Sequence, residues 1–329
     1  MKEKKLIALA LAVIMLVAAG TACSKSKTVE IPALGYVGDR DVVEIDLSLE
    51  MVPLTASPAM FGVAAPSAPG TLTKSNSKAV IDYSNSRDGY VMVKYVTPTS
   101  KQLKVLIKGP SGVQYNYNLR GDGNYDVFPF SDGNGEYTIG VYEQIEGTRY
   151  STSNTLTLTV TLSDEFAPFL RSNQYVNFAN STTTVAKAAE LVADKTELMA
   201  KISAIYNYVI STLKYDRELA ANVKTGYLPD VDAVLERGMG ICFDYAAVMA
   251  SMLRSQDIPT KLVIGYAGTV YHAWIDVYSE EAGWINSIII FDGSTWKLMD
   301  PTYAATANQS SEVMRYIGDG SNYNAMYLY

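Results

Sequence analysis

Cys242 has the sequence surroundings of a reactive thiol. A glycine-bearing turn, Met239-Gly240-Ile241, precedes it and an apolar pattern of helical spacing follows it, so the thiol is predicted at the start of a helix. Unpaired N–H groups and the positive end of the helix dipole favour a thiolate there, and a neighbouring imidazolium would bring the thiol pKa into the range of about 3.5–7.5. Such a thiolate could act as a nucleophile at neutral pH.

The single histidine of the chain and one carboxylate follow Cys242 in the order that a thiol catalytic site needs. His272 lies in a predicted strand and could take and return a proton. Asp300 ends the next strong strand, and antiparallel pairing of the two strands would place its carboxylate beside the imidazole. Each residue alone has a structural interpretation, as a small buried hydrophobe, a hydrogen-bonding side chain or a turn residue. Because all three occur in order and in suitable elements, the sequence favours a Cys242–His272–Asp300 triad.

The rare residues limit the other kinds of site. With one His and two Cys in 329 residues, a zinc site built from these side chains would lack ligands, and no metal or other cofactor is expected. Clusters of Asp and Gly at residues 121–123 and 132–135 leave a calcium-loop interpretation open, although hairpin turns use the same residues.

Residues 79–165 carry short runs of alternating apolar and polar side chains, which is the pattern of half-buried strands. Turn residues separate the runs. Several strands of regular spacing with one apolar face predict an antiparallel β-sandwich domain. Strands are expected at residues 90–95, 103–108, 113–118, 137–142 and 155–160.

Residues 166–329 change to a helical period and then return to strands. Asp194 and Glu197 have the spacing of a capping box ahead of an apolar series that ends near Tyr215. Helices are expected at residues 198–213, 231–237 and from Cys242 to a stop at 257–259, and strands at 261–266, 271–278 and 296–299. A helix that begins at a Cys and is followed by antiparallel strands predicts an α+β domain.

Two later segments have no settled interpretation. Residues 279–294 are longer than a simple hairpin and would either cover the site or extend the sheet. Residues 303–329 would form a packed tail with a short helix near residues 312–317.

The N-terminus is predicted to be a targeting segment. Residues 1–22 begin with lysines and continue as an apolar run, as in a secretory signal peptide. The run ends in small residues before Cys23 and resembles a bacterial lipoprotein signal, in which the Cys is lipidated; Gly20 departs from the usual pattern, so plain secretion stays open. Residues 23–78 are rich in Pro, Ala, Ser and Thr and are expected to form an extended tether.

Three strings of the C-terminal region resemble the transglutaminase-like superfamily, whose core is a papain-like thiol site. They are Gly240-Ile-Cys-Phe-Asp-Tyr-Ala246, His272-Ala-Trp-Ile-Asp276 and Leu298-Met-Asp-Pro-Thr302, within a resemblance that covers about residues 190–305. The resemblance implies that Cys242, His272 and Asp300 are nucleophile, general base and orienting carboxylate. The expected fold is therefore an α+β, papain-like transglutaminase core of helices and antiparallel sheet, preceded by an Ig-like β-sandwich domain.

Five residues are expected to support this site. The backbone N–H of Cys242 is a candidate oxyanion donor, and Tyr227 is a second candidate. Asp244 is expected to cap the Cys242 helix or to complement its dipole rather than to act directly. Trp274 and Trp296 flank the base and the orienting carboxylate and are expected to shield the pair from water rather than to contact substrate.

The resemblance implies attack on an amide bond and formation of a thioester. Water as the second nucleophile would make the protein a peptidase, amidase or deamidase, whereas a primary amine would make it a crosslinking transamidase; both stay open. A lipid anchor at Cys23 would place the enzyme outside the cytoplasm on the bacterial membrane, near protein or cell-wall peptide substrates. The formal charge of −7 disfavours a nucleic-acid partner. In the alternative interpretation, the β-sandwich binds a surface partner and the thiol domain is a scaffold without activity.

Overall fold

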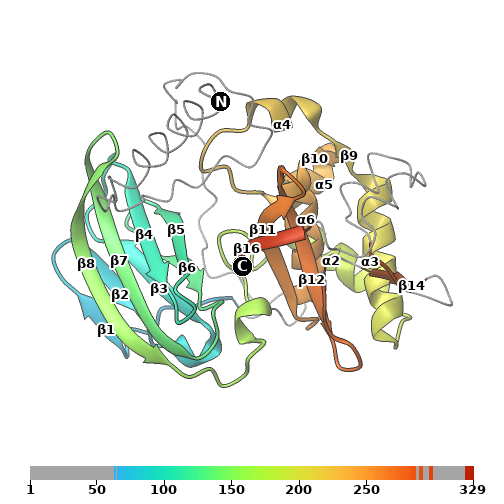
Figure 1. Cartoon of the computed structure of the whole chain (residues 1–329), viewed down its shortest axis with the longest axis horizontal. Coiled ribbons are helices and arrows are strands. Elements are labelled where there is room, and N and C mark those ends of the chain that lie inside the picture. Colours follow the sequence, from blue (N-terminus) through green and yellow to red (C-terminus); the bar gives the residue numbers. More distant parts are fainter. Residues whose placement is uncertain (1–62, 64, 287–288, 292–295, 299–322) are drawn as a thin grey trace, which may run out of the picture. The chain divides into compact units, whose positions relative to one another are not determined.

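The computed structural model describes residues 63, 65–286, 289–291, 296–298 and 323–329 (Figure 1). Its first half consists of two four-stranded antiparallel sheets. One sheet has the order β1-β2-β3-β6, with β1 Thr73–Ser75, β2 Ala79–Asp82, β3 Tyr90–Tyr95 and β6 Asp126–Pro129. The other has the order β5-β4-β7-β8, with β4 Leu103–Lys108, β5 Gln114–Leu119, β7 Gly135–Glu146 and β8 Arg149–Val160.

The two sheets form a sandwich because their inward side chains pack together. Tyr117 of β5 meets Phe128 of β6 with ring centroids 4.9 Å apart, and both side chains are buried. The sandwich begins ahead of residue 79, where the sequence placed its start, since β1 pairs with β2 and the N–H of Gly70 donates to Asp82 at 2.7 Å. The last residues of the expected tether therefore belong to the sandwich.

The second half contains the helices, which are separated by short connections. They are α2 Thr182–Val192, α3 Leu198–Thr212, α4 Arg217–Asn222, α5 Val231–Arg237 and α6 Cys242–Arg254, with short 3-10 helices at Ser86–Asp88 and Ala167–Phe169. The expected helices at α3, α5 and α6 are present, and α2 and α4 are additional. The capping box expected ahead of α3 is wrong: no side chain caps this helix, and Asp194 instead pairs with Lys195 at 2.5 Å.

A four-stranded antiparallel sheet of order β13-β12-β11-β16 completes this half. Its strands are β11 Thr260–Ala267, β12 Val270–Ser279, β13 Gly283–Ile285 and β16 Tyr323–Leu328; two further pairs are β9 Lys214–Tyr215 with β10 Met239–Gly240, and β14 Ile289–Phe291 with β15 Trp296–Leu298. Part of segment 279–294 thus extends the sheet, through β13. The end of the expected tail is an edge strand, whereas its predicted helix at 312–317 lies outside the described residues.

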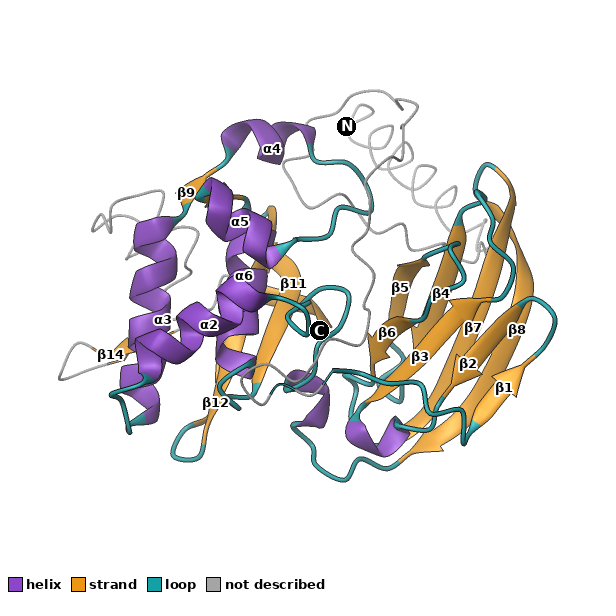
Figure 2. Ribbon diagram, turned by 180° about the vertical axis from the view of Figure 1, so that it is seen from behind, coloured by secondary structure: helices purple, strands orange, loops and turns teal. Residues whose placement is uncertain are grey.

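Helix α6 is the centre of this half. It packs against β11 and β12 on one side and against α2, α3 and α5 on the other, as Figure 2 shows. Every residue from Cys242 to Arg254 is buried, including the polar Asp244, Ser251 and Arg254. Burial of the whole helix fixes the place of its first residue.

Aromatic rings connect the sandwich to the helical half. Tyr175 stacks on Tyr329 with centroids 3.9 Å apart and contacts Tyr117 of β5 at 5.8 Å. On its other side Tyr175 lies 5.5 Å from Phe243, the neighbour of Cys242. The Gln174 side-chain amide also donates to the backbone oxygen of Asn118 at 2.9 Å. Strand β5 therefore supports the segment that lies against the start of α6.

In the described part of the chain, no helix combines the length and apolar character needed to cross a membrane. The predicted signal peptide and Cys23 lie outside the described residues.

Asp230 sets the start of α5, which packs on α6. Its carboxylate accepts a hydrogen bond from the N–H of Ala233 at 3.1 Å. We expect Asp230→Ala to lower the free energy of unfolding by about 1 kcal/mol, because the cap bond is lost. Asp230→Ser should retain most of the stability, since a serine hydroxyl also caps. Urea unfolding followed by circular dichroism measures both; equal stability of the alanine variant and the parent chain would contradict this account.

Candidate active site

The Cys242 thiol lies at the first position of α6 and is free and buried, with 5% of the residue exposed. The preceding Ile241 has extended backbone (φ −94°, ψ 176°), so the helix begins abruptly at the cysteine. Within the described chain, the N–H groups of Cys242 and Phe243 are paired with no acceptor, whereas the N–H of Tyr245 bonds to the Ile241 carbonyl at 3.1 Å. These are the unpaired donors that helix starts offer to a negative charge.

Backbone hydrogen bonds fix the turn that precedes Cys242. Strand β10 runs parallel to β9, and the N–H of Asp216 donates to the Gly240 carbonyl at 2.9 Å. Gly240 must lack a side chain, because a Cβ there would stand 2.5 Å from the Cβ of Asp244. The glycine thus lets the Asp244 side chain pack directly on the turn before the thiol.

Asp244 is fully buried and accepts two short hydrogen bonds. One comes from the N–H of Ile241 at 2.8 Å and the other from the hydroxyl of Tyr227 at 2.5 Å. Arg237 lies beside them, 3.2 Å from the Tyr227 oxygen and 3.5 Å from the Asp244 carboxylate. Burial raises the pKa of Asp244, against the lowering effect of these partners. The residue thus caps the helix that Cys242 begins, and it does so with a carboxylate kept from water.

The same geometry corrects the expectation for Tyr227. Its hydroxyl carries one proton, which is directed at Asp244 rather than toward a substrate. Burial and the neighbouring Asp244 raise the pKa of Tyr227, so the hydroxyl keeps that proton. Tyr227 is therefore placed as a support of Asp244 and not as an oxyanion donor.

His272 lies near the start of β12 and is buried, with 4% of the residue exposed. Its ring is 6.5 Å from that of Trp274 and 6.5 Å from that of Tyr323 on β16. Opposite His272 on β11 stands Gly265, where a Cβ would collide with the Asn324 carbonyl and the Trp274 ring. Trp274, itself buried, therefore packs across the glycine beside the histidine; its shielding role stays a prediction.

The strand before Asp300 is β15, whose partner among the described strands is β14. Among the described strands, β12 pairs with β11 and β13, whereas β15 pairs with β14. Strand β13 pairs with β12 only at Val277–Ser279, away from His272, so the expected pairing of the His272 strand with the strand that leads to Asp300 stays a prediction. Asp300 itself and the side chain of Trp296 lie outside the described residues.

The sequence reasoning missed Tyr271. Its hydroxyl is buried and has no hydrogen-bond partner in the described structure, which is unusual for a polar group. Burial raises the pKa of Tyr271, and Cys242 is among the neighbours that add to this effect. Its position next to the only histidine was the one available signal. Arg237 was missed as well, since nothing in the local pattern points to a contact with Asp244.

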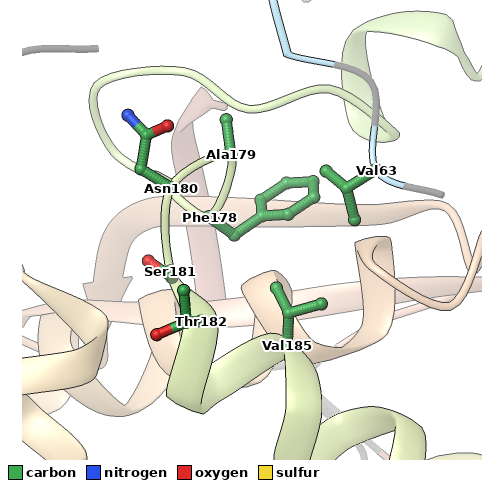
Figure 3. A pocket seen from close by; sticks show the side chains of 7 residues that line it. All are labelled: Val63, Phe178, Ala179, Asn180, Ser181, Thr182 and Val185. Atoms are coloured by element: carbon green, nitrogen blue, oxygen red, sulfur yellow. The ribbon is translucent and has the colours of Figure 1, made fainter. Parts of the chain in front are cut away.

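Among the residues that the structure describes, no three His, Cys, Asp or Glu side chains gather as metal ligands would. A small hollow lies between Phe178 and Val185 and is closed by Val63 (Figure 3). Its free volume of about 10 Å³ is the space of one water molecule, and none of the candidate site residues lines it.

Part of the chain is similar to known proteins. Residues 185–287 match the family model of the transglutaminase-like superfamily, and the match includes Cys242 and His272 and ends before Asp300. The "Uncharacterized protein YebA" of Bacillus subtilis (strain 168) is 26% identical over an alignment of 135 residues, and the match covers 35% of this chain and 18% of that protein. The match thus spans less than a fifth of that relative's length.

Solved structures with a similar fold include a candidate cysteine protease from Cytophaga hutchinsonii and the transglutaminase of red sea bream. The first is 15% identical, with 71% of this chain and 73% of that chain covered and a TM-score of 0.37. The second is 11% identical, with 69% and 53% covered and a TM-score of 0.28.

Residues 185–287 thus match a transglutaminase-like core. The expected α+β fold class is confirmed, as helices and an antiparallel sheet follow a β-sandwich. This core, with a thiol at the start of its central helix, supports a cysteine-based enzyme of this class.

Proposed function

We propose that the protein is a thiol enzyme that acts on amide bonds of proteins or peptides through a thioester at Cys242. The observation that carries the proposal is the place of this thiol, at the first residue of a buried helix with unpaired N–H groups beside it. The only histidine of the chain lies on a strand of the sheet against which that helix packs. Both residues fall within the matched core.

In the proposed reaction, the Cys242 thiolate attacks the carbonyl carbon of the amide. The oxyanion that forms accepts hydrogen bonds from the N–H groups at the start of α6. The imidazolium of His272 then gives its proton to the leaving amine as the C–N bond breaks, and a thioester remains. Asp300 is proposed to hold the imidazole in the required tautomer.

The second nucleophile decides the product. Water would release a carboxylic acid and make the enzyme a peptidase or deamidase, whereas a primary amine would form a new amide and make it a transamidase. In both cases the Cys242 thiolate leaves, and His272, neutral after the first step, removes the proton of the incoming nucleophile. One experiment distinguishes hydrolysis from transamidation.

The experiment incubates the protein with casein, a glutamine-rich protein, and a fluorescent primary amine, and identifies products by mass spectrometry. Incorporated amine identifies a transamidase, a gain of one mass unit at glutamine a deamidase, and cut chains a peptidase. We expect Cys242→Ala to lose the product completely, because no other thiol occupies this position. If Cys242→Ala retains the activity of the parent chain, the proposal is wrong.

We further propose that the enzyme works outside the cytoplasm, anchored to the bacterial membrane by a lipid on Cys23 or, alternatively, secreted. The signal-like run of residues 1–22 and the small residues before Cys23 support this location. Surface proteins and cell-wall peptides would then be within reach. Metabolic labelling with an alkyne-tagged fatty acid, compared with a Cys23→Ser variant, tests the anchor.

A further inference from the structure

The three side chains behind the Cys242 turn have no part in the steps above. The Asp244 carboxylate accepts hydrogen bonds from the N–H of Ile241 and the hydroxyl of Tyr227. Arg237 lies beside this carboxylate and this hydroxyl. Placing a carboxylate here is costly, because Asp244 has no exposed surface and its nearest cation is at 3.5 Å. A role of this carboxylate other than stabilising the fold would account for its burial.

The network fixes the turn at two backbone groups. Arg237 donates from Nε to the Met239 carbonyl at 2.8 Å, and Asp244 accepts from the N–H of Ile241 at 2.8 Å. Asp244 therefore reaches back out of the helix, and it does not use the N–H groups of Cys242 and Phe243. These two donors are left unpaired in the described structure, next to a turn held by the two hydrogen bonds above.

We propose that Asp244, Tyr227 and Arg237 are positioning residues, which hold the Met239–Ile241 turn so that the N–H groups of Cys242 and Phe243 receive the oxyanion. This inference rests on the proposed function, because it requires Cys242 to be the nucleophile. Oxyanion donors act through fixed geometry, and small displacements of such groups are expensive in rate.

The charge on Asp244 allows its positioning effect to be distinguished from a direct electrostatic effect on the Cys242 thiol. A carboxylate two residues from Cys242 repels a thiolate, and Arg237 offsets this only in part because it is 3.5 Å away. Loss of the carboxylate charge should therefore favour the thiolate. Loss of positioning should disfavour any reaction that passes through an oxyanion. The two effects have opposite signs.

The test compares two reactions of Cys242 in the full chain at pH 7. Acylation by 4-nitrophenyl acetate passes through an oxyanion, whereas alkylation by iodoacetamide does not. In Asp244→Asn the amide oxygen still accepts one bond, but its NH2 group cannot accept the other. We expect acylation to fall by about 10²-fold, with alkylation as fast as in the parent chain or faster. Tyr227→Phe should move acylation in the same direction by a smaller factor.

Asp232→Asn is the matched control. The Asp232 carboxylate accepts from the hydroxyl of Thr184 at 2.7 Å and from its N–H at 2.8 Å, so this substitution also disturbs a helix start, away from Cys242. It should leave the ratio of acylation to alkylation unchanged. A parental ratio in Asp244→Asn, or a parallel loss of both reactions, would overturn the positioning role.

Two further outcomes keep the inference separate from the proposed function. If Cys242→Ala removes acylation while Asp244→Asn retains the parental ratio, only the positioning role fails. If the parent chain shows no acylation that depends on Cys242, the proposed function fails first. If Asp244→Asn does not fold, Tyr227→Phe decides the question, because it keeps the hydrogen bond that the Ile241 N–H donates to Asp244. A parental ratio of acylation to alkylation in Tyr227→Phe then overturns the positioning role.

Discussion

Replacing His272 with alanine is expected to slow thioester formation by about 10²–10⁴-fold, which is the usual contribution of a general acid–base group. The chain has no second histidine to substitute for it. The same change should slow alkylation of Cys242 by iodoacetamide near pH 6, because an imidazolium beside the sulfur favours the thiolate at acidic pH. The pH profiles of alkylation in the parent chain and in the variant measure this effect directly.

Trp274→Phe is a control for packing around the histidine. Trp274 neighbours the ring of His272 and is itself buried, so the change disturbs the same pocket without removing a titrating group. We expect its alkylation profile to keep the parental midpoint. Identical profiles in His272→Ala and in the parent chain would show that no ion pair forms, and the proposed role of His272 would be abandoned.

Replacing Arg254 with leucine is expected to lower the free energy of unfolding by about 3–5 kcal/mol. The guanidinium is buried at the end of α6 and donates to three backbone oxygens, those of Thr260 at 2.8 Å, Arg171 at 2.7 Å and Tyr329 at 2.5 Å. A leucine would remove this donor from all three oxygens, at about 1–3 kcal/mol for each one left unpaired, and would also remove a buried charge. The Tyr329 oxygen keeps a second bond, from the N–H of Leu262 at 2.9 Å. Burial lowers the pKa of Arg254 to about 9, so the charge is retained at neutral pH.

Guanidinium chloride unfolding of the Arg254→Leu variant measures this loss. Arg254→Lys is the informative companion, because an ammonium on a flexible stem keeps the charge and cannot reproduce the three-way fork. It should lose most of the same stability. A loss below about 1 kcal/mol in the leucine variant would mean that the three oxygens find other donors.

Local signals in the sequence predicted several elements with their bounds. Strands 90–95 and 103–108 coincide with β3 and β4, because their alternating side chains fit one buried face. Helix 231–237 coincides with α5, where Asp230 caps the start and Gly238 closes the end with φ +64°. In these cases the deciding signals, the alternation of side chains and the helix caps, lie within a few residues of each other.

Contacts between distant segments could not be predicted in this way. The strand β16 was expected only as part of a packed tail, and it becomes a strand by pairing with β11. Strand β13 was not predicted either, since it is three residues long and carries little strand signal of its own. The role of Tyr227 depended on a contact with Asp244 across 17 residues, and no local rule reports it.

The stacked rings at Tyr175 have a consequence for folding. Tyr117 belongs to one half of the chain and Phe243 to the other, and Tyr175 touches both while lying flat on Tyr329. Unfolding of either half would expose these aromatic rings to water. The remaining half would then lose the stabilisation that their burial provides. The two halves are therefore expected to unfold cooperatively, and the start of α6 is expected to unfold together with the sandwich.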